Sequence, residues 1–385
     1  MSLRGAAHIV GIHEYPDRKI EGKTLAQLHA EVARAALDDA GLTKADVDAY
    51  FTDSVAPGLG PMSMIDYLGL DVRHAESTDT GGASYLMHVS HAAQAIRAGK
   101  CDVALITFAG MPRSGQGTPL PTMSSTPESS FELPYRVTVP AQYALAARRH
   151  MHEFGTTPEQ LAWIKVAASH HAQHNPHAML REVVTVADVV NSRMVADPLH
   201  LLDCCVVSDG AGAIIVARPE IARSLKRPGV RLRGAGEAVK TLKGGRVDLT
   251  TTAAARSGPI AFAEAGVTPA DIKYASIYDS FTITVLLQLE DLGFCAKGRG
   301  GAFVADGNLI SGIGKLPFNT DGGGLCNNHP NNRGGATKIF EAVRQLRGEA
   351  HPAVQVANCD LALVQATGAM LTTRHSSATL VLEAV

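Results

Sequence analysis

Residues 36–54 read ALDDAGLTKADVDAYFTDS, and residues 261–279 read AFAEAGVTPADIKYASIYD. Six residues are identical at the same spacing in the two stretches, among them Gly41 and Gly266. Each copy has the pattern of a helix that ends at a glycine, followed by a short polar turn and a β-rich stretch. The chain is therefore predicted to contain a duplicated α/β unit.

The duplication continues along the chain in the same order. Gly-Gly-Ala occurs at 81–83 and again at 334–336, and a helical pattern follows it each time. Strand-like runs come next, CDVALI at 101–106 and CDLALV at 359–364. Strands that alternate with amphipathic helices predict sheets covered by helices on their faces. We expect an α/β protein with an N-terminal half at 1–230 and a C-terminal half at 231–385.

One stretch of the first half, from about 110 to 195, has no counterpart in the second half. It begins with a segment rich in Pro, Ser and Thr, and two helical patterns follow, at 141–154 and 157–174. Long insertions of this kind commonly form lids or binding loops. We therefore expect a loop domain that is inserted into the first repeat.

Charge and composition exclude several classes of partner. The chain of 385 residues has 35 Lys and Arg against 37 Asp and Glu, and only 5% aromatic residues. This near balance gives no electrostatic reason to expect nucleic acid or an anionic membrane as a partner. The apolar stretches are all interrupted before the roughly 20 residues that a membrane helix needs. No membrane association is expected.

The cysteines and the first residues indicate the compartment. None of the six cysteines forms a CxxC pair, and Cys204 and Cys205 are adjacent, so neither a zinc site nor a disulfide framework is predicted. His170 and His174 have a spacing that a metal could use, but no carboxylate or cysteine joins them, and no metal site is predicted. The N-terminal residues lack a sustained apolar segment. We expect a cytoplasmic protein.

Four further blocks carry a resemblance to a known family: GGASYL at 81–86, PLHLLDCCVVSDGAGAIIVA at 198–217, YDSFTITVLLQLEDLGFC at 278–295 and NTDGGGLCNNHPNNRGGATKIFEAVRQLRGE at 319–349. Together they resemble a thiolase, most closely the subgroup related to sterol-carrier-protein-type thiolases and non-specific lipid-transfer proteins. The resemblance implies the thiolase fold, with two βαβαβαββ halves in a five-layered αβαβα arrangement. It also implies an inserted loop domain that covers coenzyme A, and a homodimer.

The two cysteines of ordinary thiolases are missing. The resemblance places Gly82 at the position of the nucleophilic cysteine, and the second cysteine should fall within 366–368, a segment that ends at Gly368. Thiolase chemistry needs a thiolate as the nucleophile and a second thiol as acid and base. Acyl transfer through the usual cysteine is therefore contradicted by the sequence.

Of the two family residues that stabilise the negative charge on a thioester oxygen, one is retained and one is replaced. His329, in Asn328-His329-Pro330, stands where the family keeps its catalytic histidine. Tyr278, in the motif that continues with Asp279, stands where the family has Asn or His in the same oxyanion hole. Two donors aimed at a thioester oxygen would stabilise an enolate. The resemblance implies His329 and Tyr278 as catalytic residues, with Gly82, Asp279, Asn328 and Gly368 around them.

An enolate without an acyl-enzyme points to aldol chemistry. Removal of the 3-hydroxyl proton from a 3-hydroxyacyl-CoA breaks the C2–C3 bond, and this step needs an acid/base and an oxyanion hole but no cysteine. The chain resembles thiolase relatives that lack the cysteine and act as aldolases on steroid side-chain CoA thioesters. Those relatives work with a small companion protein built of a zinc ribbon and an OB-fold. The resemblance thus implies a lyase with a CoA thioester as substrate, no covalently bound cofactor, and such a companion.

Two alternatives remain open from the sequence. Cys326 lies three residues before His329 and could serve as a relocated nucleophile of an acyltransferase. The loss of both cysteines also allows a non-catalytic subunit that binds acyl-CoA or lipid. The retention of His329 and the chemically useful Tyr278 favour an enzyme, and we expect the retro-aldolase.

Overall fold

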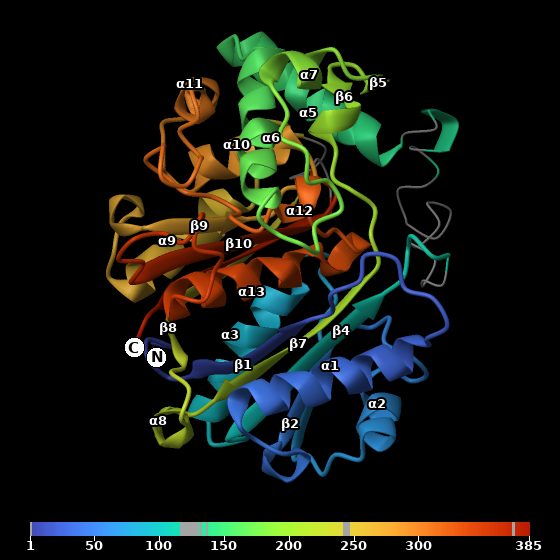
Figure 1. Ribbon diagram of the computed structural model, residues 1–385, viewed down its shortest axis with the longest axis vertical. Coiled ribbons are helices and arrows are strands. Elements are labelled where there is room, and N and C mark those ends of the chain that lie inside the picture. Colours follow the sequence, from blue (N-terminus) through green and yellow to red (C-terminus); the bar gives the residue numbers. More distant parts are fainter. Residues whose placement is uncertain (1, 116–129, 131–132, 136–137, 242–246, 372–373) are drawn as a thin grey trace.

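The computed structural model describes residues 2–115, 130, 133–135, 138–241, 247–371 and 374–385 (Figure 1). Most of the segment rich in Pro, Ser and Thr, at the start of the predicted insertion, lies outside these residues. Within the described parts of the chain, no helix is both long and apolar enough to cross a membrane.

Among the described residues, nine strands form one mixed sheet in the order β3-β2-β4-β7-β1-β8-β11-β10-β9. The strands are β1 His8–Glu14, β2 Ala49–Thr52, β3 His74–Ser77, β4 Val103–Gly110, β7 Gly210–Ala217, β8 Val230–Lys240, β9 Tyr274–Ile277, β10 Leu361–Ala369 and β11 His375–Glu383. A separate two-stranded ribbon pairs β5 Met194–Ala196 with β6 Leu199–His200.

The helices cover the sheet and build the insertion. They are α1 Leu25–Ala40, α2 Pro61–Leu68, α3 Ser84–Arg97, α5 Val139–Phe154, α6 Pro158–Ala172, α7 Val186–Val190, α8 Pro219–Ser224, α9 Ala254–Ala265, α10 Thr282–Asp291, α11 Gly300–Val304, α12 Gly323–Cys326 and α13 Gly334–Arg347.

The repeated sequence pattern forms the same local structure twice. Helix α1 ends at Gly41 and helix α9 ends at Gly266, both in the left-handed conformation that glycine adopts without strain. In each copy a threonine then caps a short 3₁₀ turn, and its backbone N–H donates to an aspartate three residues later. A strand follows each turn, β2 in the first half and β9 in the second, so the predicted duplication is present in the structure.

The layers alternate between helix and sheet. Helix α1 packs on β1, β4 and β7, while α9 packs on β8 and β11, on the outer side of the second half. Between the halves lie α3 and α13, which contact each other, and each of which touches strands of both halves (Figure 1). The sheet passes from one half to the other at the short β1–β8 pair, and its two parts lie on either side of α3 and α13, so the predicted five-layered α/β arrangement is confirmed. The exact boundary between residues 230 and 231 stays a prediction.

The described part of the insertion lies over the second half. Figure 1 shows α5, α6 and α7, in green, at the top of the view, with α6 beside α10 and above α12. Helix α6 contacts α10, α11 and α12, and α5 contacts α10. Buried alanines of α5 and α6 share one apolar cluster with α10 and β9. This packing brings the insertion to the ends of β9 and β10, where the motif residues lie.

Candidate active site

Tyr278 and His329 come together at the end of strand β9. Tyr278 directly follows β9, and its backbone N–H donates to Gln365 O of β10. His329 lies in the short connection between α12 and α13. The distance from His329 Nε2 to Tyr278 Oη is 3.0 Å. The structure thus pairs two residues that the sequence motifs place in one site.

Burial decides the protonation state of both side chains. Tyr278 is 6% exposed and His329 is 9% exposed. Burial lowers the pKa of His329 to about 4, so its imidazole is neutral at pH 7. Burial raises the pKa of Tyr278 well above its usual value near 10, and its phenol stays protonated. At neutral pH the pair is a phenol hydrogen-bonded to a neutral imidazole, which can accept a proton.

Gly82 lies against the Tyr278 ring. A Cβ atom at position 82 would stand 2.4 Å from Thr367 O and 2.9 Å from Tyr278 Cε2. Real Cβ atoms do not approach other heavy atoms so closely. The tyrosine ring and strand β10 therefore occupy the space that a side chain at position 82 would need. Position 82, where the resemblance implies the nucleophilic cysteine, therefore has no room for a side chain.

Gly368 and Gly334 complete a lining of glycines. A Cβ at Gly368 would stand 1.6 Å from Thr80 O, so this end of β10 has no room for the second cysteine. A Cβ at Gly334, the first residue of α13, would stand 2.9 Å from His329 Cδ2. The bare backbone at Gly334 lets the start of α13 pack directly on the Tyr278–His329 pair, and Gly368 lets β10 pack on Thr80.

Gly82→Ala is expected to lower the free energy of unfolding by about 1–3 kcal/mol and to reduce activity, because the added methyl group must displace β10 or the Tyr278 ring. Denaturant unfolding and the cleavage assay described below measure both effects. Gly229→Ala is the matched control with a smaller expected loss, since its Cβ would meet the nearest atom, His8 Cβ, at 3.2 Å rather than 2.4 Å. Wild-type stability and activity in Gly82→Ala would contradict the steric argument.

Asp279 hydrogen-bonds to the helices on both sides of His329. Its Oδ1 accepts from Gly324 N at 2.8 Å, and its Oδ2 accepts from Leu325 N at 3.1 Å. Lys338 Nζ of α13 donates to the same carboxylate at 2.7 Å, and both side chains are fully enclosed. Asp279 therefore ties α12 to α13 on either side of His329. A carboxylate engaged in this way is not a donor to a substrate oxygen.

The Asn328 side chain forms hydrogen bonds that hold the connection between α12 and α13. Its Oδ1 accepts from Ser208 Oγ at 2.7 Å, and its Nδ2 donates to Glu14 Oε1 at 2.9 Å. Ser208 Oγ in turn accepts from the backbone N–H of His329 at 2.9 Å. The Asn328 side chain is thus used within the protein, and it fixes the backbone that carries His329.

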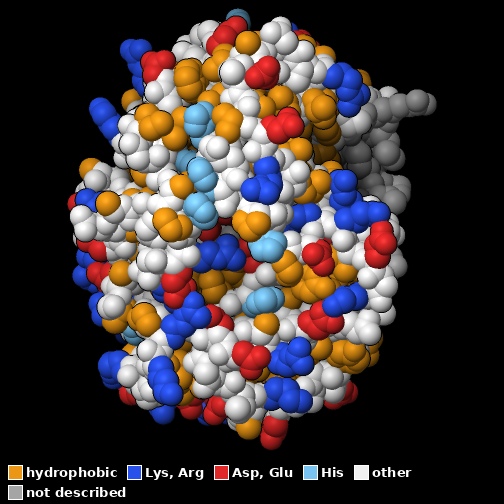
Figure 2. Space-filling view, viewed as in Figure 1, with side chains coloured by type: hydrophobic (Ala, Val, Ile, Leu, Met, Phe, Trp, Pro, Cys, Tyr) orange, Lys and Arg blue, Asp and Glu red, His pale blue; other side chains and the backbone are white. Residues whose placement is uncertain are grey.

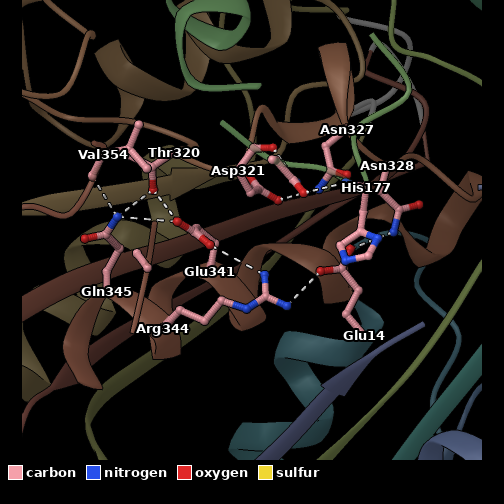
Figure 3. Close-up of polar contacts among 12 residues, drawn as sticks. Glu14, His177, Thr320, Asp321, Asn327, Asn328, Glu341, Arg344, Gln345 and Val354 are labelled. Atoms are coloured by element: carbon pink, nitrogen blue, oxygen red, sulfur yellow. Dashed lines mark hydrogen bonds and ion pairs between the residues drawn. The ribbon is translucent and has the colours of Figure 1, made fainter. Parts of the chain in front are cut away.

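A polar network continues behind this loop (Figure 3). Glu14 pairs with Arg344, which also approaches Glu341, and Thr320 donates to Glu341 at 2.6 Å. Burial and the nearby Asp321 raise the pKa of Glu341 to about 7. These groups line a cleft of about 300 Å³, and neither Tyr278 nor His329 lines it. Two arginines and four carboxylates line this cleft, so acidic side chains outnumber basic ones there.

The surface over this cleft carries histidines. Figure 2 shows histidine side chains near the middle of this face, among basic and acidic side chains. His174, His177 and His351 belong to the lining, and the rings of His174 and His351 stack at 5.1 Å. Within the described residues, no group of three or more His, Cys, Asp or Glu side chains is arranged to hold a metal ion.

Cys326 lies in the apolar core under the insertion. It is 1% exposed, and Lys165 Nζ of α6 donates to its Sγ at 3.2 Å. Burial raises the pKa of the thiol, which disfavours the thiolate that a nucleophile requires. The polar group at its sulfur is Lys165 rather than His329. The geometry gives little support to the alternative in which Cys326 replaces the missing nucleophile.

Tyr143 is a residue beside the site that was not predicted. This residue lies in the first predicted helix of the insertion, α5, and its ring stacks on Phe281 with centroids 4.3 Å apart. Its hydroxyl donates to Ala369 O at 3.4 Å, beside Gly368. Because the insertion has no copy in the second half, no repeated pattern marks Tyr143 in the sequence.

Comparisons with known proteins show which family the chain is similar to. Residues 236–384 match the family described as "Thiolase C-terminal domain-like". The chain is 36% identical to a "17-hydroxy-3-oxo-4-pregnene-20-carboxyl-CoA lyase" of Mycobacterium tuberculosis, over 90% of this chain and 92% of the relative. It is 34% identical to an "Acetyl-CoA acetyltransferase" of Methanothermobacter thermautotrophicus, over 89% of this chain and 91% of that protein.

A solved structure is similar over the whole chain. The structure named "Ltp2-ChsH2(DUF35) aldolase" matches with a TM-score of 0.89 and 35% identity, over 100% of this chain and 99% of its own. The resemblance expected from the sequence motifs is therefore confirmed by both sequence and structure. The chain belongs to the thiolase family.

Proposed function

We propose that the protein is a retro-aldolase that cleaves a 3-hydroxyacyl-CoA through a thioester enolate, without an acyl-enzyme. The observation that carries the proposal is the Gly82–Tyr278 contact, because the space for the cysteine side chain is occupied by a tyrosine that is hydrogen-bonded to His329. The names of the aldolase and lyase relatives support this reading. One relative is named an acetyltransferase, so the family alone does not decide the reaction.

The proton path is assigned to the hydrogen-bonded pair. The substrate's 3-hydroxyl gives its proton to Tyr278 Oη, while the phenol proton passes to His329 Nε2, 3.0 Å away. The O–H electron pair becomes the second bond of a carbonyl group, and the C2–C3 bond breaks. Its electrons move onto the thioester as an enolate, and a ketone or aldehyde leaves. A proton must then reach C2 to give the shortened acyl-CoA.

We also propose the assembly that the sequence resemblance implies. The name of the matching aldolase structure includes a second protein with a DUF35 domain, which supports a companion for this chain. The names of the lyase and the acetyltransferase support coenzyme A thioesters as substrates. A homodimer and a cytoplasmic location complete the proposal, and steroid side-chain thioesters are the first substrates to test.

Product analysis tests the function directly. A branched 3-hydroxyacyl-CoA, incubated with the full chain and no free CoA, is expected to give equal amounts of a carbonyl compound and a shortened acyl-CoA. The reaction is run with and without the candidate companion, and mass spectrometry quantifies both products. No cleavage across a series of 3-hydroxyacyl-CoA substrates, with the companion present, would overturn the proposal.

A second arm addresses the alternatives. The chain is incubated with a 3-ketoacyl-CoA and free CoA, where a thiolase with a relocated thiol would form two thioesters. We expect no such products, and we expect Cys326→Ala to cleave the 3-hydroxyacyl-CoA at close to the wild-type rate. Thioester formation that is lost in Cys326→Ala would establish the acyltransferase. Binding of acyl-CoA without any turnover would establish a non-catalytic subunit.

A further inference from the structure

The proposed reaction leaves one proton unassigned. After the carbonyl product leaves, the enolate must take a proton at C2, and a second thiol would ordinarily supply it. Position 368 cannot carry any side chain here, because its Cβ would lie 1.6 Å from Thr80 O. The adjacent residues Ala366 and Thr367 hold no acid of suitable strength. The donor must therefore reach this place from another element.

Tyr143 of helix α5 reaches the same place from the insertion. Its hydroxyl lies 3.4 Å from Ala369 O, the carbonyl next to Gly368. Its ring stacks on Phe281 at 4.3 Å and 29°, and Phe281 belongs to the same motif as Tyr278. Tyr143 is 4% exposed, so the stacked ring has a fixed position. The contact to Ala369 O is long for an O–H donor, and the Ser280 side chain is a second hydrogen-bond partner of the hydroxyl.

The chemical state of Tyr143 suits a proton donor. Burial raises its pKa to about 12, so the phenol is protonated at neutral pH. A thioester enolate is a far stronger base than a phenolate, and a neutral phenol can therefore protonate it. Burial is the largest cause of the raised pKa of Tyr278. The second is the negative charge that Tyr143 would carry when deprotonated. A change in the charge of the Tyr143 hydroxyl therefore changes the pKa of Tyr278.

We propose that Tyr143 donates the proton that C2 receives after carbon–carbon cleavage, in place of the missing second cysteine. This inference rests on the proposed retro-aldolase. The O–H bond of Tyr143 breaks, its electron pair stays on the oxygen, and the enolate electron pair forms the new C2–H bond. The proton that His329 took from the 3-hydroxyl then returns through Tyr278 to the Tyr143 phenolate. Protons and electrons balance over one turnover, and no co-reactant is needed.

Tyr143→Phe is expected to separate carbon–carbon cleavage from the protonation of C2. The phenyl ring keeps the stack on Phe281, so we expect the fold and acyl-CoA affinity to be retained. In rapid-quench experiments with a 3-hydroxyacyl-CoA, we expect a burst of about one carbonyl product per site, followed by turnover that is slower by about 10²-fold. Tyr278→Phe should show no burst, because cleavage itself is then slow. Tyr135→Phe, in an exposed tyrosine of the insertion, is the matched control.

The outcomes distinguish this inference from the function on which it rests. A wild-type steady-state rate in Tyr143→Phe would overturn the inference, while cleavage by the wild-type protein would leave the retro-aldolase intact. An equal slowing of burst and turnover, with a raised KM or a lowered melting temperature, would assign Tyr143 a structural role only. Absence of cleavage in the wild-type protein would instead reject the proposed function itself.

Discussion

Tyr278→Phe is expected to lower kcat for carbon–carbon cleavage by about 10²–10⁴-fold, the range that one positioned acid or base contributes. The substitution removes the hydroxyl that lies 3.0 Å from His329 Nε2 and leaves the ring beside Gly82. Because the ring still fills this space, stability and acyl-CoA affinity should change little. Steady-state release of the carbonyl product measures the loss.

Tyr274→Phe is the matched control for that experiment. Tyr274 is a buried tyrosine of β9, four residues before Tyr278, and the hydrogen bond that its hydroxyl accepts from Thr320 N is long, at 3.4 Å. We expect it to retain near wild-type activity. His329→Ala should be as slow as Tyr278→Phe, and the double variant little slower than either, since the two act as one unit. Additive losses would show that they act independently, and full activity in Tyr278→Phe would reject its role.

Much of the fold could be predicted because its signals are local. The end of a helix at Gly41, and again at Gly266, depends on a positive φ that glycine adopts freely, so a short stretch of sequence contains the information. The pairing of Tyr278 with His329 is a long-range contact that no local signal encodes. It could be predicted only because two motifs resemble those of a family in which the equivalent residues meet.

The remaining features of the site depend on contacts that leave no pattern in the sequence. Asp279 pairs with Lys338 of α13, which follows His329 in the sequence. The sequence around Lys338 does not distinguish it from a surface lysine of an amphipathic helix. Tyr143 belongs to an insertion without a repeat, and its contact with Ala369 joins residues far apart in the chain. The reason why position 82 must be glycine also becomes visible only when the Tyr278 ring is placed.

Lys338→Met is expected to lower the free energy of unfolding by about 3–5 kcal/mol, the usual cost of leaving one member of a buried ion pair alone. Lys338 is 1% exposed and Asp279 is fully buried, so water cannot replace the lost ammonium group. The backbone N–H donors of Gly324 and Leu325 remain, but they do not neutralise the charge. Urea unfolding of the full chain, compared at equal slope, measures the change.

The double variant Asp279→Asn/Lys338→Met should recover part of this stability, because the amide oxygen can still accept from Gly324 N and no buried charge is left. Lys19→Met, at an ion pair exposed to solvent, should change nothing measurable. If Lys338→Met were equally harmless, the ion pair of Asp279 with Lys338 could not be what holds α12 to α13. Because α12 and α13 flank His329, the single variant should also lose cleavage activity. The double variant should regain some of it.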